Sequence, residues 1–335
     1  MTITQCDTSR DLGKVKQEAR PTYKTRLGAM YQGDCESILR SHPVTSQKSK
    51  VQLILTSPPF PLNRKKKYGN LTGDEYLNWL KRLAPLFRDY LTSDGSIVIE
   101  LGNAWEAGKP IMSTLPLKSL MAFMEAANLN LCQEFICYNP ARLPTPAQWV
   151  TVERIRVKDA FTRVWWMSPV EKPKADNRKI LTEYSESMRK LLRKGTYNSG
   201  PRPSGHHIGK TSFLSDNGGA IPPNLFVSTP SSYDSGLMEV LPISNTKAND
   251  PYQSYCRENN ITPHPARMQA DLARFFIDFL TDNDDLVMDP FAGSNTTGYV
   301  AEELLRRWLS IELNSTYIES SKARFSTELL SQIPD

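Results

Sequence analysis

Apolar and polar positions along the first half of the chain switch repeatedly between two periods. Short runs rich in Val, Ile and Leu are typical of strands, and apolar residues that recur every three or four positions are typical of helices. The expected strands occupy residues 51–55, 96–101, 131–138 and 163–167. The expected helices occupy residues 76–91, after a capping box at 72–75, and 117–127. An Asp-Gly turn at 94–95 is expected to end the first helix.

The same alternation returns near the C-terminus after a long irregular stretch. Expected strands lie at 285–289 and 308–312, and expected helices at 265–280, 296–306 and 316–330. Between residues 172 and 264, one helical pattern at 178–194 is followed by sequence rich in Gly, Pro, Ser and Asn. Strands that alternate with helices predict an α/β fold with a doubly wound, mostly parallel sheet. The simplest architecture is one α/β domain built from both ends of the chain, with a loop-rich region inserted.

Composition and charge narrow the possible partners. The chain has 335 residues, of which 39% are hydrophobic and 23% charged. This composition is typical of a globular protein and argues against a disordered chain. The net charge of +5 is unevenly spread, because residues 142–260 hold 17 Lys and Arg against 11 Asp and Glu. A second basic group is the tetrad Arg64, Lys65, Lys66 and Lys67. Two basic regions on an otherwise neutral chain favour a polyanionic partner over a merely solvated surface.

Cysteine spacing and the length of apolar runs argue against other classes of protein. The five cysteines contain no Cys-x-x-Cys pair, so neither a disulfide framework nor a zinc site is expected. Adjacent His206 and His207 lack further ligands at a metal-binding spacing, and we expect no metal. Apolar runs are too short to cross a bilayer, and the N-terminus lacks the apolar segment of a secretory signal. A cytoplasmic protein is therefore expected.

Residues 286–298, Leu-Val-Met-Asp-Pro-Phe-Ala-Gly-Ser-Asn-Thr-Thr-Gly, predict a strand, a tight loop and a helix start. Small residues let a ligand approach such a loop closely. The segment lacks the GxGxxG pattern and a Walker lysine, which disfavours a nicotinamide dehydrogenase or a nucleoside triphosphate site. Asp289 suits an ammonium group, and Glu312 ends the next strand, where a carboxylate can hold a ribose diol. These features indicate S-adenosyl-L-methionine; the alternative is a βαβ unit with an incidental acid.

A second motif, Thr56-Ser57-Pro58-Pro59-Phe60, follows the strand at 51–55. Two prolines fix the backbone and leave carbonyl groups as acceptors. An acceptor pair beside an aromatic ring can hold a planar base and its exocyclic amine. In isolation, the same string could simply cap a strand.

Together, the two motifs resemble those of the permuted, β-type amino DNA methyltransferases. Ser-Pro-Pro-Phe is typical of the cytosine-N4 branch, whereas adenine-N6 enzymes usually carry Asp-Pro-Pro-Tyr. The resemblance spans nearly the whole chain and is strongest to the PvuII-type modification methylases. It extends over residues 30–34, 64–70, 154–166, 202–206, 217–225 and 264–267. Residues 228–255 depart from the family pattern, so no recognition sequence can be transferred.

The resemblance implies a seven-stranded Rossmann-like sheet with circularly permuted motif order, and it implies site residues. The catalytic residues would be Ser57, Pro58, Pro59 and Phe60. The cofactor would be bound by Asp34, His264, Pro265, Arg267, Asp289, Phe291, Gly293, Ser294, Thr296, Thr297 and Glu312, with residues 264–267 starting a helix. DNA would be contacted by Arg64, Lys65, Lys66, Lys67, Arg202, Ser204, His206 and Lys210. For Trp165 and Trp166, core packing is favoured over a role in a base pocket.

The expected function is methyl transfer from S-adenosyl-L-methionine to the N4 amine of cytosine in a specific double-stranded DNA sequence, by base flipping. The protein would be the modification enzyme of a restriction-modification system, and a cognate endonuclease would act on the same site without a stable complex. We expect residues 1–170 and 263–335 to form the catalytic domain and residues 171–262 to recognise the target. The alternatives are adenine-N6 methylation and an inactive DNA-binding module.

Overall fold

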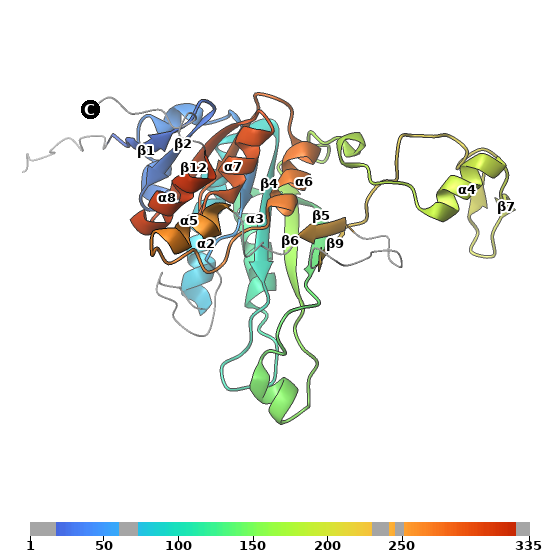
Figure 1. The fold of residues 1–335 in the computed structure, drawn as a ribbon, viewed down its shortest axis with the longest axis horizontal. Helices are drawn as coiled ribbons and strands as arrows, with labels where there is room; N and C mark the ends of the chain where they lie inside the picture. Colours follow the sequence, from blue (N-terminus) through green and yellow to red (C-terminus); the bar gives the residue numbers. More distant parts are fainter. Residues whose placement is uncertain (1–17, 60–72, 230–240, 245–250, 326–335) are drawn as a thin grey trace, which may run out of the picture.

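Ten strands form one continuous sheet in the residues that the computed structural model describes, which are 18–59, 73–229, 241–244 and 251–325 (Figure 1). The strands are β1 Pro21–Lys24, β2 Gly28–Gln32, β3 Val51–Thr56, β4 Leu91–Gly102, β5 Asn130–Tyr138, β6 Phe161–Ser168, β9 Leu225–Thr229, β10 Leu241–Ser244, β11 Leu286–Asp289 and β12 Arg307–Glu312. Their order is β1-β2-β12-β11-β3-β4-β6-β5-β9-β10. Neighbouring strands are parallel except in the pairs β1–β2, β4–β6 and β5–β6.

The mostly parallel α/β sheet is confirmed, but it is wider than the expected seven strands. The contiguous set β2-β12-β11-β3-β4-β6-β5 corresponds to the expected seven. At one edge β1 folds back on β2, and at the other β9 and β10 continue the sheet beyond β5. The strands β9 and β10 come from the region whose Gly, Pro and Ser content predicted loops. They are strands because β9 pairs with β5, an interaction that the local pattern does not contain.

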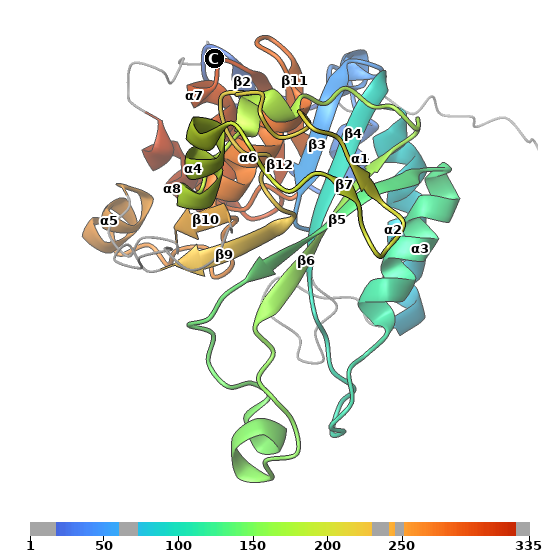
Figure 2. The same ribbon diagram turned by 90° about the vertical axis from the view of Figure 1, so that its right-hand side faces the viewer.

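Alternate residues of the central strands point into two hydrophobic layers. Leu53 and Leu55 of β3 join α6 (Ala270–Leu280) and α7 (Thr296–Glu303), whereas Ile54 joins α2 (Gly73–Arg88) and α3 (Leu115–Ala127). Figure 2 shows these helix pairs on opposite sides of the sheet. Burial on both faces explains why the parallel strands have continuous apolar runs. Among the described helices, none is both long and apolar enough to span a membrane.

The expected turn at Asp94-Gly95 lies inside β4, and Leu91 begins that strand instead of ending the preceding helix. The pairing of β3 with β4 shifts between Val51↔Leu91 and Leu53↔Ser96, so β4 bulges here. A Cβ atom at Gly95 would lie 3.0 Å from the Val51 carbonyl oxygen. Gly95 therefore permits the close approach of β4 to β3, although the Asp-Gly pair had predicted a turn.

The expected helix at 178–194 is divided in two. A 3₁₀ turn, η3 (Asn177–Ile180), is followed by α4 (Glu186–Lys194). The break occurs because the Ser185 side chain accepts a hydrogen bond from the Met188 amide and caps α4.

The C-terminal helices are also shorter than their patterns. The helix α6 begins at Ala270, so residues 264–267 are not a helix start, and α7 ends at Glu303. The last helix, α8 (Ser315–Ser321), passes into the 3₁₀ turn η4 (Lys322–Arg324). Residues 326–330 of the expected last helix lie outside the described residues.

Two parts of the chain project from the sheet (Figure 1). The arm combines residues 103–113 after β4 with residues 139–160 between β5 and β6, including the π-helical turn η2 (Gln148–Val152). The lobe, residues 181–224, contains α4 and the strands β7 (Gly200–Pro201) and β8 (His207–Ile208). Residues 171–262 are thus not one structural unit, because β9 and β10 join the sheet and α5 (Pro251–Glu258) packs beside α8 and η4.

Candidate active site

A cavity of about 620 Å³ opens where the carboxyl ends of five adjacent strands meet. Asp34 follows β2, Glu312 ends β12, Asp289 ends β11, Ser57 follows β3 and Asn103 follows β4. Ligands of parallel α/β sheets bind at this edge. In strand order, Ser57 lies between two sides of the cavity. We call them the carboxylate side (Asp34, Asp289 and Glu312) and the arm side (Asn103, Trp105, Arg142, Thr145 and Asp159).

Asp289 is buried, with 4% of its surface exposed, and accepts three hydrogen bonds. Its Oδ1 accepts from Thr56 Oγ1 at 2.7 Å and from the Phe291 amide at 3.1 Å, and its Oδ2 accepts from Thr297 Oγ1 at 2.7 Å. Burial raises the pKa of Asp289 to about 6, although these hydrogen bonds oppose the rise, and the nearby charge of Glu312 adds to it. The carboxylate is fixed in place, and its environment favours a cationic ligand.

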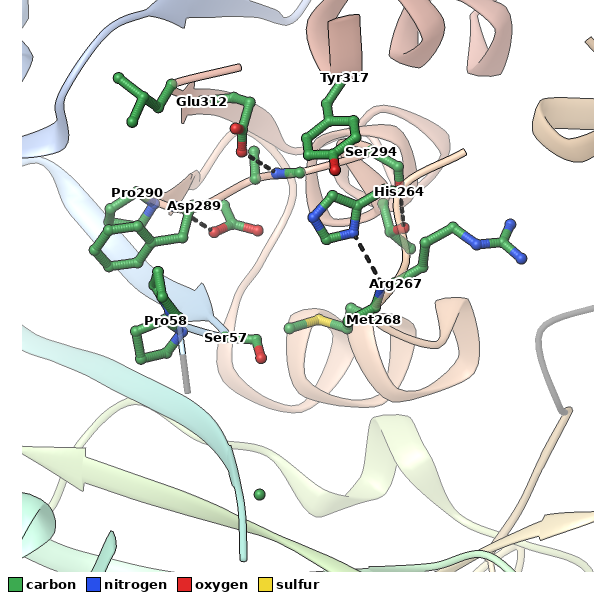
Figure 3. Close-up of a pocket in the computed structure, with 18 of the residues that line it drawn as sticks. Ser57, Pro58, His264, Arg267, Met268, Asp289, Pro290, Ser294, Glu312 and Tyr317 are labelled. Carbon is green, nitrogen blue, oxygen red and sulfur yellow. Dashed lines mark hydrogen bonds between the residues drawn. The ribbon is translucent and has the colours of Figure 1, made fainter. Parts of the chain in front are cut away.

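Glu312 is held by two backbone amides, and Figure 3 shows one of these hydrogen bonds as a dashed line. Its Oε2 accepts from the Gly293 amide and its Oε1 from the Asn314 amide, both at 2.8 Å. Burial raises the pKa of Glu312, and the backbone hydrogen bonds oppose the shift. An ionised carboxylate has about four acceptor positions, so Glu312 keeps capacity for ligand hydroxyl groups.

Gly293 is required for two reasons. Its φ of +52° lies in the left-handed region, and a Cβ atom there would come within 3.0 Å of His264 Nε2. The His264 ring is itself positioned by Tyr317, with ring centroids 4.5 Å apart, and its Nδ1 accepts from the Ala266 amide at 3.3 Å. Figure 3 shows the ring beside Ser294, over the loop that follows β11.

The loop between Asp289 and α7 is braced from behind by residues that the sequence did not indicate. Arg324 Nε donates to the Ser294 carbonyl at 2.6 Å, and Arg324 Nη2 donates to Ser294 Oγ at 3.1 Å. Asn295 donates to the Tyr23 hydroxyl at 2.9 Å and accepts from Ser310 Oγ at 2.7 Å. The loop is therefore rigid before a ligand binds.

The rim of the carboxylate side combines a helix cap with aromatic rings. Asp34 Oδ2 accepts from the Ser37 amide and hydroxyl, both at 3.0 Å, and caps α1 (Cys35–Leu39). Phe291 packs against Trp79, with centroids 5.4 Å apart, and Trp79 packs against Tyr76 at 5.5 Å. Both α2 rings line the cavity, although the sequence had indicated Tyr76 only as an apolar position of the helix and had not indicated Trp79.

The Ser-Pro-Pro segment borders the same cavity. Ser57, Pro58 and Pro59 line it, whereas Phe60 lies outside the described residues. The hydrogen bond from Thr56 to Asp289 joins this segment directly to the carboxylate side. Since proline has no amide hydrogen, the segment offers acceptor carbonyls to a ligand.

On the arm side, sequence reasoning missed a polar cluster. The Asn103 side-chain amide donates to Asp159 Oδ1 at 2.9 Å and to the Phe161 carbonyl at 3.4 Å, and Arg142 donates to the same carbonyl at 3.0 Å. Two acceptors fix the orientation of the Asn103 amide. Asn103 Oδ1 is consequently a buried acceptor with no partner among the described residues, which costs about 1–3 kcal/mol. Asp159 lies in the stretch 154–166 that resembles the family, but no periodicity or motif links it to Asn103 and Arg142. Only the fold brings the three residues to Ser57.

A family model for DNA methylases matches residues 51–323, which include both motifs and all five strand ends except that of β2. The chain belongs to this family. Type II methyltransferase M.PvuII from Proteus hauseri is 42% identical to this DNA methylase over 315 residues, covering 93% of this chain and 88% of that protein.

Solved structures agree with the methylase fold. The structure described as PvuII DNA methyltransferase (cytosine-N4-specific) has a TM-score of 0.69 at 37% identity and covers 93% of this chain and 90% of its own. A putative DNA modification methylase from Thermus thermophilus, complexed with S-adenosyl-L-methionine, has a TM-score of 0.50 at 19% identity. The match covers 91% of this chain and 94% of the Thermus thermophilus chain, and it supports the fold alone.

The cavity of this methylase brings together most of the expected cofactor residues. Those that line it are Asp34, His264, Arg267, Asp289, Phe291, Gly293, Ser294, Thr296, Thr297 and Glu312. Pro265 does not line it. The stretch 264–267 is not helical and bends at 265–266, and His264, Ala266 and Arg267 line the cavity while Pro265 does not.

The remaining expected residues lie elsewhere in the methylase. Trp165 and Trp166 are buried in the core, where their ring nitrogens donate to Glu134 and Ser96, and neither lines the cavity. The lobe carries Arg202, Ser204, His206 and Lys210, away from the cavity, so their DNA contact stays a prediction. The tetrad Arg64, Lys65, Lys66 and Lys67 lies outside the described residues.

Proposed function

We propose that this DNA methylase transfers a methyl group from S-adenosyl-L-methionine to the N4 amine of cytosine in a specific sequence of duplex DNA. The observation that carries the proposal is the single cavity in which Ser57-Pro58-Pro59 meets Asp289 and Glu312. The cytosine-N4 specificity of the PvuII enzyme supports the choice of base because its chain is 37% identical to this one.

The residues on the carboxylate side fit the cofactor. Asp289, whose pKa is raised by burial, suits an ammonium group, and Glu312 has acceptor capacity for the ribose hydroxyl groups. The missing Cβ of Gly293 lets the His264 ring lie against the loop, and both residues line the cavity. Phe291 and Trp79 provide apolar surface for the adenine ring.

S-adenosyl-L-methionine supplies an electrophilic methyl group. The amine of cytosine is a poor nucleophile because its lone pair is delocalised into the ring. Hydrogen bonds accepted by Ser57 and by the Pro58 carbonyl favour a pyramidal nitrogen whose lone pair points toward the carboxylate side. Rate enhancement then comes mainly from proximity and orientation. Ser57 does not need to be a strong base, since the methylated amine is acidic enough to lose a proton to water.

The arm side has the properties of a site for the target base. A base inside a duplex cannot reach a recessed Ser57, so the nucleotide must rotate out of the stack. Asn103 Oδ1, a buried acceptor without a partner in the described residues, supports the presence of a donor from the ligand on this side. We assign target recognition to residues 171–262 and backbone contact to the lobe residues Arg202, Ser204, His206 and Lys210, together with the basic tetrad.

Biologically, the enzyme fits the modification half of a restriction-modification system, as the type II relatives do. A cognate endonuclease would act on the same site without a stable complex. Because the substrate is genomic DNA, we place the enzyme in the cytoplasm of a bacterial or archaeal cell.

The proposal is tested by nucleoside analysis. Plasmid DNA from cells that express the protein is digested to nucleosides and examined by mass spectrometry, and the modified positions are mapped by sequencing. N4-methylcytosine at one repeated sequence is the expected result, and cells that carry the empty vector are the control. N6-methyladenine instead would assign the protein to adenine methylation, and unmodified DNA would leave a binding module.

A further inference from the structure

Side-chain contacts hold the two segments of the arm together. The ring of Trp105 carries the Arg156 guanidinium at 3.9 Å from its centroid, and Arg156 also donates to the Pro110 carbonyl at 3.2 Å. These contacts tie the segment after β4 to the segment between β5 and β6. Lys158 Nζ donates to the Pro140 and Arg142 carbonyls at 2.7 and 3.3 Å. The two segments therefore hold each other in position at the mouth of the cavity.

This rigid arm exposes apolar side chains to solvent. Val157 is 86% exposed and Leu143 is 75% exposed, the two highest values among the large apolar residues of the described chain. Arg142 and Thr145, on either side of Leu143, line the cavity, and so does Asp159, two residues after Val157. Both aliphatic side chains thus stand beside the opening through which the target base would enter.

The charges around these two side chains suit a polyanion. Along the arm, the cations are Lys109, Arg142, Arg154, Arg156 and Lys158, and the acids are Glu106, Glu153 and Asp159. One of the acids, Asp159, is already bonded to Asn103. Aliphatic side chains flanked by Arg and Lys are the combination with which proteins enter a base stack while they grip the phosphates.

We propose that Leu143 and Val157 form an apolar wedge that enters the duplex and occupies the space left by the extruded target nucleotide. The cations of the arm would hold the backbone on either side of the gap. This inference rests on the proposed function and adds the device that opens the duplex. Extrusion costs unpairing and unstacking, and an apolar side chain that fills the gap offsets part of that cost.

The test uses the full-length protein and the mapped target sequence. In the variant Leu143→Ser/Val157→Ser, kcat/KM on a fully paired duplex should fall about tenfold or more, equivalent to about 1.4 kcal/mol per factor of ten. Affinity for the cofactor, measured by calorimetry, should not change. Met121→Ser on α3, where the side chain is 54% exposed, is the matched control and should behave as the wild type. Leu143→Met/Val157→Leu, which keeps apolar bulk, should retain activity.

A second substrate separates a wedge from an ordinary contact. When the target cytosine faces an abasic site, extrusion is easier, so the Ser variant should recover most of its lost activity. The fluorescence of 2-aminopurine at the target position should rise on binding of the wild type and much less with the Ser variant.

Several results would overturn the wedge. Equal loss on paired and abasic-opposed duplexes would make these residues a plain contact surface, and unchanged activity would remove their role. A changed sedimentation coefficient of the variant would identify a self-association surface instead. If the wild type methylates no DNA, the proposed function itself fails. If the wild type and the Ser variant are equally active, only the wedge fails.

Discussion

The carboxylate side of the cavity and the arm differ in burial and in charge. Asp289 is buried and bonded to three groups, and Glu312 is held by two backbone amides. In the arm, by contrast, Leu143 and Val157 stand in solvent among Arg and Lys side chains. The carboxylate side is acidic, and its groups are held in place before a ligand binds. The arm is basic, and its apolar side chains are exposed to solvent.

This difference follows the chemistry of the two substrates. A small cation is best bound by acids that are already oriented, because reorganisation would weaken the interaction. A duplex is a long polyanion, so exposed cations attract it and exposed apolar groups become buried only in the complex. We therefore expect substitutions on the carboxylate side to change cofactor affinity and substitutions in the basic regions to change DNA affinity. Substitution of Ser57 should change turnover more than either affinity.

The largest effect is expected from Ser57→Ala. Loss of the group that acts on the amine should lower kcat by about a hundredfold, the usual scale for a positioned group at the reacting atom. Single-turnover kinetics gives the rate, and calorimetry gives the cofactor dissociation constant, which should stay within about twofold. The exposed Ser46→Ala is the control. An equal loss of cofactor binding would move Ser57 to the carboxylate side and erase the distinction.

Next in size is Glu312→Ala. The variant should weaken cofactor binding by about 1–3 kcal/mol, the cost of losing a buried, charge-assisted hydrogen bond. Glu312→Gln should also be defective, because both carboxylate oxygens accept backbone amides and the Gln NH₂ group cannot. Affinity for unmethylated DNA should be unaffected. Glu125→Ala, an exposed substitution on α3, serves as the control; normal cofactor binding by both Glu312 variants would refute the assignment.

A pH dependence is expected from Asp289, whose pKa is raised by burial to about 6. Above that pH the carboxylate is charged and favours a cation, so cofactor affinity should fall as the pH decreases through 6, approaching tenfold per pH unit. Calorimetry between about pH 5 and pH 8 measures it. Asp289→Asn should bind weakly throughout, with a shallower dependence on pH than the wild type. A flat wild-type profile would show that no cation is bound at Asp289.

Stability should respond to pH in the opposite sense. The unfolded Asp has a pKa of about 3.9, so the folded state binds the Asp289 proton more tightly between about pH 3.9 and pH 6. The contribution of this group to the free energy of unfolding therefore decreases as the pH rises through that window. Comparison of Asp289→Asn with the wild type by urea unfolding, at each end of this pH window, isolates the contribution of Asp289 to the free energy of unfolding.

The smallest effect per residue is expected from the basic tetrad. Changing Lys65, Lys66 and Lys67 to Gln should weaken binding about equally for cognate and unrelated duplexes, because lysine supplies charge without bidentate base contacts. The slope of log affinity against log salt should flatten by up to about one unit per lost phosphate contact. Filter binding at several salt concentrations tests this. Lost discrimination with an unchanged slope would mean that the tract reads sequence.

The sequence by itself was sufficient to single out the two motifs. Asp289 and Glu312 were identifiable because each ends a short apolar run, and Ser57 because two prolines follow it. Strand and helix type were readable wherever burial imposes a strict period, as in β3 and α3. The predicted boundaries were wrong where a single interaction overrides the period. The Ser185 cap divides the helix expected at 178–194, and the pairing of β4 with β3 continues a strand through Gly95.

The tertiary structure alone decided which distant residues meet. The pairing of β3 with both β11 and β4 brings Asn103, Arg142 and Asp159 to the opposite side of Ser57 from the acids, and strand order is not written in any local pattern. The same holds for the Arg324 and Tyr23 braces and for β9, which is a strand because it pairs with β5. It holds also for Leu143 and Val157, because residue type does not reveal whether a side chain is covered. Periodicity records only what each segment buries locally, whereas the cavity is formed by contacts between segments that are far apart in the chain.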